Sequence, residues 1–67
     1  MRERVWQYQD LSGVHTITDG EILREFYPLW SDMMKKAGKE KLISEENCIE
    51  DFVVVHWASR VGERIHE

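Results

Sequence analysis

The chain has 67 residues, 13 acidic and 9 basic, and a net charge of −4, so we expect one small domain spanning 1–67. The acidic balance disfavours a protein that mainly coats phosphate backbone, because such binding relies on clustered lysine and arginine. Cys48 is the single cysteine, which excludes a disulfide within the chain and favours a reducing, cytoplasmic setting. The longest strongly apolar run, 52–55, is too short for a membrane span, and the first residues do not resemble a signal peptide.

Residues 4–11 are expected to form a strand, because aromatic and β-branched residues alternate there with glutamine. Ser12 and Gly13 then predict a turn. Residues 14–17 fit either a short second strand or an extended connector, and the pattern leaves both alternatives open.

A long helix is predicted over 22–37, because apolar residues recur there at spacings of three and four. Thr18 and Glu21 match a capping box at its start. Gly38 is well placed as a left-handed cap at its end. Pro28 removes one helical hydrogen bond. Since the apolar stripe stays in phase across this proline, we predict one kinked helix rather than two.

Ser44 is expected to cap a second, short helix that buries Cys48, Ile49 and Phe52. Residues 52–58 are β-branched and aromatic, which predicts a last strand covered on both faces. The tail, 59–67, fits an extension of that strand, a helical turn or a frayed end.

These elements predict an α+β fold, a small β-α-α-β domain with an antiparallel sheet of two or three strands packed against two helices. A sheet of two strands alone is marginal in water. Either 14–17 supplies a third strand, or a second copy of the chain completes the sheet. The second alternative predicts a homo-oligomer, a dimer or a higher assembly.

The spacing of reactive side chains predicts no catalytic residue, no cofactor-binding residue and no metal ligand, so we expect a protein that is not an enzyme and needs no cofactor. Cys48 falls on the apolar side of its helix and is interpreted as a buried structural thiol. His15, His56 and His66 lack the close spacing of metal ligands, and His56 is interpreted as a half-buried residue bonded to backbone. An enzyme with a site between subunits would need His15, His56 and Asp10 to converge beside a cleft.

Aromatic side chains are frequent for so short a chain, and they are the most specific hint of function. Tryptophan and tyrosine carry polar groups that need partners, so not all of them can be fully buried in a monomer. Such residues are also enriched at protein interfaces. The candidate interaction surface comprises Trp6, Tyr8, Tyr27, Trp30 and Trp57.

One basic cluster lies around the end of the predicted long helix. It comprises Lys35, Lys36, Lys39 and Lys41. We interpret it as a helix end whose charges complement the helix dipole. A patch that contacts nucleic acid is the alternative, which the acidic remainder of the chain disfavours.

Segments 11–13, 18–23, 27–30, 33–40 and 43–58 resemble small uncharacterised proteins of marine tailed phages, particularly those that infect cyanobacteria. The resemblance implies an accessory protein that works inside a bacterial cell, and it implies no activity and no functional residues. Together with the composition, it leads to the hypothesis of a non-enzymatic module that binds a protein or associates with itself. A small nucleic-acid-binding protein that uses the lysine cluster is the alternative.

Overall fold

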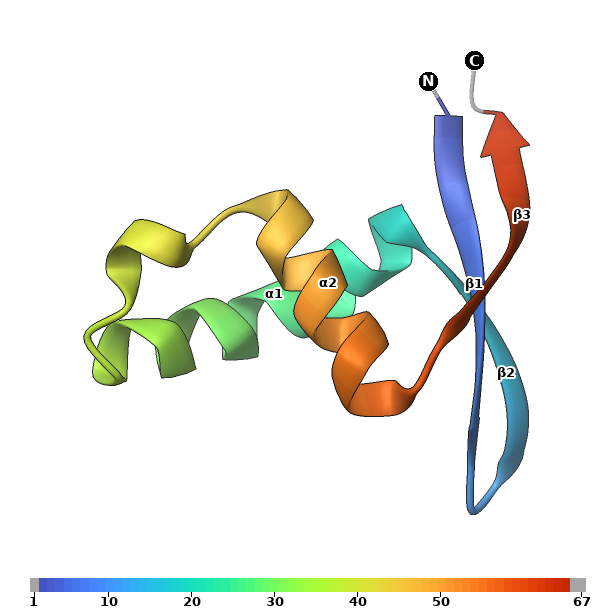
Figure 1. Cartoon of the computed structure of the whole chain (residues 1–67), viewed down its shortest axis with the longest axis horizontal. Coiled ribbons are helices and arrows are strands. Elements are labelled where there is room, and N and C mark those ends of the chain that lie inside the picture. The colour runs from blue at the N-terminus through green and yellow to red at the C-terminus, as the bar shows by residue number, and fades with distance from the viewer. Residues whose placement is uncertain (1, 66–67) are drawn as a thin grey trace.

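A three-stranded antiparallel sheet is packed against two α-helices in the computed structural model, which describes residues 2–65 (Figure 1). The elements in chain order are β1 (Arg2–Asp10), β2 (Gly13–Thr18), α1 (Asp19–Lys36), the short 3₁₀ helix η1 (Glu40–Leu42), α2 (Glu45–His56) and β3 (Ser59–Ile65). The sheet order is β2-β1-β3, so the first and last strands are neighbours. The expected α+β fold, an antiparallel sheet with two helices, is confirmed.

β1 and β2 form a hairpin in which Val5 lies opposite Thr18 and Asp10 lies opposite Gly13. Gly13 has a φ of 124°, which a glycine adopts without the steric cost that a side chain would add. The structure thus decides between the two alternatives for 14–17, because these residues are a strand.

α1 is one helix that runs through Pro28, as the in-phase apolar stripe predicts. The predicted capping box is present: the Thr18 hydroxyl accepts from the Glu21 N–H at 3.3 Å, and the Glu21 carboxylate accepts from the Thr18 N–H at 3.1 Å. Gly38 follows the helix with a φ of 73°, in the left-handed region where glycine is favoured.

The prediction of a strand over 52–58 is wrong, because α2 continues through these residues to His56. The Ser44 hydroxyl caps the helix by accepting from the Asn47 N–H at 3.1 Å. A valine in a helix costs less than about 1 kcal/mol relative to alanine. Burial of Phe52 against the sheet offsets that cost, so tertiary packing overrides the local strand preference.

β3 lies in the tail that the sequence left open, and it pairs with β1. Each of its residues is exposed, so the expected strand covered on both faces is not found. The remainder of that tail, 66–67, lies outside the described residues.

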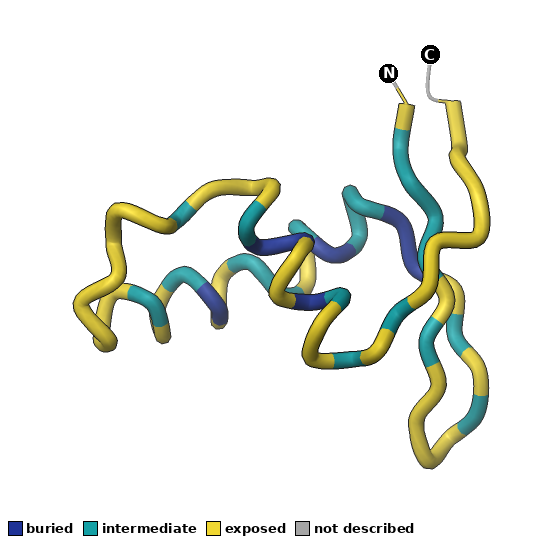
Figure 2. The backbone as a smooth tube through the Cα atoms, viewed as in Figure 1, coloured by how far each residue is buried: buried dark blue, intermediate teal, exposed yellow. Residues whose placement is uncertain are grey.

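The core sits between the helices and one face of the sheet. Figure 2 shows the buried residues gathered where β2 leads into α1 and where the two helices meet. The buried hydrophobic residues are Ile17, Ile22, Trp30, Cys48, Ile49 and Phe52. Around this small core the chain is flat, with extents of 34 × 33 × 15 Å. Among the described residues no helix is both long enough and apolar enough to cross a membrane.

Candidate functional site

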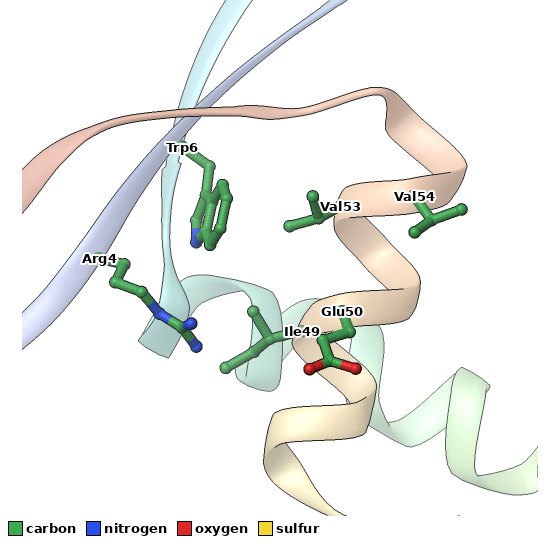
Figure 3. A pocket seen from close by; sticks show the side chains of 6 residues that line it. All are labelled: Arg4, Trp6, Ile49, Glu50, Val53 and Val54. Carbon is green, nitrogen blue, oxygen red and sulfur yellow. The ribbon is translucent and has the colours of Figure 1, made fainter.

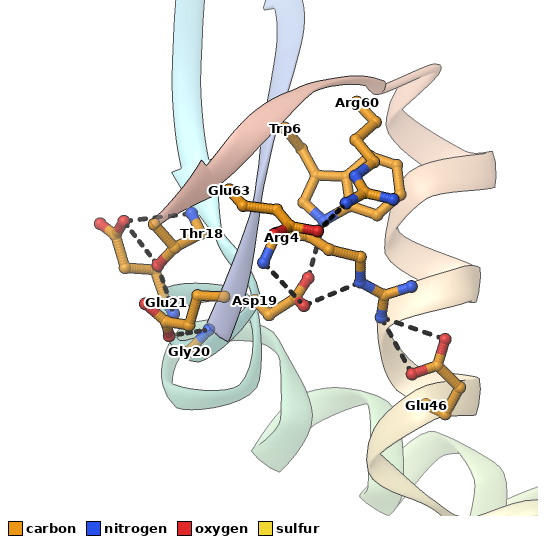
Figure 4. Close-up of polar contacts among 10 residues, drawn as sticks. Arg4, Trp6, Thr18, Asp19, Gly20, Glu21, Glu46, Arg60 and Glu63 are labelled. Carbon is orange, nitrogen blue, oxygen red and sulfur yellow. Dashed lines mark hydrogen bonds and ion pairs between the residues drawn. The ribbon is translucent and has the colours of Figure 1, made fainter. Parts of the chain in front are cut away.

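Arg4 joins β1 to the first turns of both helices (Figure 4). Its Nε donates to Asp19 at 2.9 Å, and one of its terminal nitrogens donates to both carboxylate oxygens of Glu46 at 2.9 and 3.0 Å. Asp19 also accepts the indole N–H of Trp6 at 2.7 Å. The hydrogen bond from Arg4 to Asp19 is the largest cause that raises the pKa of the Arg4 guanidinium. These bonds fix the side chains of Arg4 and Trp6 on the helix-facing side of β1.

Beside this cluster, β1 and α2 enclose a hollow of about 230 Å³, which we call the β1–α2 hollow (Figure 3). Its lining residues are Arg4, Trp6, Ile49, Glu50, Val53 and Val54. The floor is apolar, and the rim carries the positive side chain of Arg4 and the negative side chain of Glu50. Within the described part of the chain, the Glu50 carboxylate has no hydrogen-bond or ion-pair partner. The hollow therefore suits an apolar group that carries a hydrogen-bond donor.

The outward side of α2 is apolar at its C-terminal end. Val54 is 73% exposed, Val55 is 64% exposed and Trp57, which follows the helix, is 90% exposed. We call these three residues the α2 ridge. Apolar patches larger than a few hundred Å² are rare on monomeric proteins and mark binding surfaces when they occur.

Trp57 has a left-handed backbone, with φ 54° and ψ 37°. Among the described residues it is the one non-glycine residue with positive φ. Left-handed backbone costs a residue with a side chain about 1–2 kcal/mol, and glycine usually occupies this position at a helix end. The indole makes no hydrogen bond or ring contact within the described residues. Neither the backbone nor the packing of the monomer explains a tryptophan here.

A second hollow, of about 390 Å³, lies between α1 and α2 on the other side of the ridge. We call it the α1–α2 hollow. Phe26, Met33 and Met34 line it from α1, and Val55 lines it from α2. Methionine side chains adapt to differently shaped partners. Val54 and Val55 thus each border a largely apolar hollow, and Trp57 borders a third depression beside Tyr8 and Val14 of the hairpin.

The five aromatic residues singled out from the sequence do not form one surface. Trp57 is exposed, whereas Trp30 is buried and donates its indole N–H to Asp51 at 2.5 Å. Trp6, Tyr8 and Tyr27 are half-buried. Trp6 lines the β1–α2 hollow, so two of the five belong to the surface around α2.

Tyr8 and Tyr27 pack within the fold. The ring of Tyr8 stacks on His15 at 5.1 Å between centroids and meets Phe52 edge-on at 5.6 Å. Tyr27 lies 5.8 Å from Trp30 on the same helix. These two tyrosines therefore contribute to the packing around the core.

The basic cluster lies at the end of α1 that is remote from the sheet and in the segment that follows (Figure 1). Its members, Lys35, Lys36, Lys39 and Lys41, are all exposed. Lys36 pairs with Asp32 one turn earlier at 3.2 Å. The first two lysines occupy the last turn of α1, where positive charge is stabilised by the helix dipole.

Asp10, Ser12 and His15 meet at the tip of the hairpin. Asp10 accepts from the Ser12 N–H at 2.8 Å, and His15 Nε2 lies 2.8 Å from the Ser12 hydroxyl and 2.9 Å from Asp10. One imidazole nitrogen faces both groups, whereas a serine–histidine–aspartate relay uses the two different nitrogens. The cluster therefore closes the turn. Hydrogen bonds from Ser12 and then His15 lower the pKa of Asp10 to about 2.

His56 is separated from that cluster by Tyr8, whose ring lies 5.5 Å from the His56 ring. The Nδ1 of His56 lies 3.0 Å from the Phe52 carbonyl oxygen, which confirms the expected bond to backbone. His66 lies outside the described residues. Across residues 2–65, no three histidine, cysteine, aspartate or glutamate side chains are grouped as a metal ion requires.

Cys48 is fully buried, as its place on the apolar side of the helix predicts. Burial raises the pKa of its thiol, and the charge of Asp51 raises it further. The thiol is therefore held neutral at ordinary pH, which does not suit a nucleophile.

Sequence reasoning singled out Trp57 but missed the two valines of the α2 ridge, and it also missed the Arg4 cluster. The assignment of 52–58 to a strand hid the ridge. On a helix, Val54 falls on the side opposite the buried Cys48 and Phe52, so a helical projection from the Ser44 cap would have found it. Comparison with protein-family models, with curated proteins and with solved structures finds no match for the chain.

Proposed function

We propose that the chain is a small, non-enzymatic protein-interaction module that binds its partner through the α2 ridge and the hollows beside it. The observation that carries the proposal is Trp57, which is 90% exposed and held in a left-handed backbone conformation. Residues in strained conformations cluster at functional sites, and tryptophan is enriched among the residues that dominate binding energy at interfaces.

The neighbours of Trp57 support the same function. Val54 and Val55 extend the exposed apolar surface, and the two hollows offer depressions into which side chains of a partner can pack. The Arg4 bonds to Asp19 and Glu46 hold β1 and α2 together around one of these hollows. A site whose walls are fixed before binding loses less conformational entropy on association.

A capture experiment tests this function. The wild-type chain, a Val54→Glu/Val55→Glu double variant and a Leu11→Glu control are immobilised and exposed to a bacterial lysate. The bound proteins, further copies of the chain included, are then compared. Leu11 is also an exposed apolar residue, in the turn between β1 and β2, so the control adds a charge away from α2. We expect the double variant to lose the proteins that wild type and control retain. Identical captured sets for all three chains would contradict the proposal.

The setting that we propose is the cytoplasm of a bacterial host, with the chain acting as a phage accessory protein on a host or phage protein. A single buried thiol supports a reducing compartment, since Cys48 has no cysteine with which to pair. The resemblance of the sequence to small phage proteins points the same way.

Binding of nucleic acid through Lys35, Lys36, Lys39 and Lys41 is the second candidate. It is supported by the exposure of all four lysines at one end of the molecule. Filter binding of labelled nucleic acid over a salt series separates the candidates. Steep loss of binding with salt would favour the lysine patch, and no binding at low salt would remove it.

A further inference from the structure

We infer that the partner of the α2 ridge is a second copy of this chain. This inference rests on the proposed function and names the protein that binds at the ridge. In the inferred dimer, two α2 helices pack antiparallel about a two-fold axis that passes close to Val54. Trp57 of each copy enters the β1–α2 hollow of the other, beside Glu50. A homodimer with such a self-complementary interface is the commonest form of protein assembly.

The spacing along α2 makes the helix self-complementary. A helix rises about 1.5 Å per residue, so Trp57 lies about 4.5 Å from Val54 in one direction and Glu50 lies about 6 Å from it in the other. When two such helices run antiparallel about Val54, each Trp57 lies at nearly the same height along the helix axis as the other copy's Glu50. The offset along that axis is about 1.5 Å. Glu50 and Val54, four residues apart, share the outward side of α2.

The hollow and the indole are chemically matched. Trp6, Ile49 and Val53 give the β1–α2 hollow an apolar floor, and the Glu50 carboxylate stands at its rim (Figure 3). Tryptophan has a large apolar ring with one N–H donor. The Trp57 indole and the Glu50 carboxylate both lack a hydrogen-bond partner within the described residues. Each would supply the group that the other lacks.

The exposed area of the monomer agrees with the size of a dimer interface. The chain exposes 5184 Å². A folded monomer of 8.0 kDa typically exposes about 4,450 Å², which leaves an excess of about 700 Å². A standard protein interface buries about 800 Å² on each partner. The radius of gyration, 12.6 Å, also exceeds the roughly 11 Å expected for a domain of this length.

Because of the net charge, dimerisation and nucleic-acid binding should respond to salt in opposite ways. Each copy carries −4, so two copies repel one another at long range. Salt screens this repulsion, and the apolar contact at the ridge is not weakened by it. Added salt should therefore strengthen dimerisation, whereas it weakens contacts between lysine and phosphate.

Sedimentation equilibrium from micromolar to millimolar concentration, at low and moderate salt, tests the dimer. We expect wild type and the Leu11→Glu control to dimerise more tightly at moderate salt. Trp57→Gly should weaken the dimer by about 30-fold or more, the loss typical of an interface hot spot. Trp57→Asn is a second variant, because asparagine also tolerates left-handed backbone, and circular dichroism confirms that each variant is folded.

A mixture of isotope-labelled and unlabelled chains locates the contact. In isotope-filtered NMR spectra, the Trp57 ring of one copy should show contacts with the Val53 methyl groups of the other. A wild-type chain that stays monomeric throughout, or tryptophan variants that dimerise as tightly as wild type, would overturn the inference. Neither result would overturn the proposed function, because the capture experiment on Val54 and Val55 tests binding to any protein.

Discussion

The Asp19 carboxylate accepts the indole N–H of Trp6 at 2.7 Å, and this bond fixes one wall of the β1–α2 hollow. The other oxygen of the same carboxylate accepts from Arg4 at 2.9 Å. Asp19 is the first residue of α1, where a negative charge is stabilised by the helix dipole. One side chain therefore couples the start of α1 to the hollow between β1 and α2.

Replacement of that carboxylate should destabilise the fold. We expect Asp19→Ala to lower the free energy of unfolding by about 2–3 kcal/mol, because three hydrogen bonds to a charged, largely buried group are lost. Asp32→Ala is the matched control, since Asp32 forms an exposed pair with Lys36 whose loss costs about 0.3–0.5 kcal/mol. Urea unfolding of both variants measures the difference. Equal effects would show that the Arg4 cluster does not tie the elements together.

Pro28 should be a site where stability can be gained. It is exposed within the continuous helix α1, where it removes a hydrogen bond and crowds the preceding turn. We expect Pro28→Ala to raise the free energy of unfolding by about 1–3 kcal/mol, as measured by urea unfolding. Lower stability in this variant would mean that the proline ring contributes packing that its exposure does not indicate.

The buried thiol predicts a dependence of stability on alkaline pH. The pKa of Cys48 is raised in the fold, chiefly by burial, so its neutral form is favoured there. The contribution of the neutral thiol to the free energy of unfolding is fully present below the ordinary cysteine pKa. It is lost as pH rises through the raised pKa. We expect Cys48→Ala to show a smaller loss of stability than wild type as pH rises above 9. Rapid alkylation of native Cys48 at neutral pH would contradict the burial on which this prediction rests.

The hairpin tip predicts an acid titration. The pKa of Asp10 is about 2, lowered first by the Ser12 hydroxyl, so the contacts around this carboxylate stabilise the hairpin above the ordinary aspartate pKa. That contribution is lost as pH falls through about 2. Carboxyl carbon shifts in NMR measure the titration. Ser12→Ala should move the pKa of Asp10 back toward its ordinary value, and an unchanged pKa would show that the serine is not its partner.

Local signals predicted the first half of the fold. The Thr18 capping box, the phase of the apolar residues across Pro28 and the glycine at 38 lie close together in sequence, so they could be recognised without a structure. The Arg4 and Asp19 pair could not be recognised. These residues are 15 positions apart and meet only through the register of the hairpin, which a sequence pattern does not specify.

The end of α2 was mispredicted because two of its signals conflict. The valines before His56 favour a strand by local preference, and Trp57 stands where a glycine would have marked the helix end. The Ser44 cap and the burial of Phe52 favour a helix, and packing decides the outcome. The residue that breaks the local rule is also the exposed tryptophan of the candidate site, as expected where function competes with stability.

The free energy of unfolding of Trp57→Gly at low protein concentration, where the chain is monomeric, tests whether Trp57 is retained for binding rather than for folding. Glycine adopts the left-handed backbone without strain, and the indole it removes is 90% exposed. We predict that the free energy of unfolding of the variant monomer equals that of the wild-type monomer or exceeds it by up to about 1 kcal/mol. A loss of 1 kcal/mol or more, measured as urea unfolding at the same concentration, would mean that the indole stabilises the fold itself and would contradict the assignment of the α2 ridge as a binding surface.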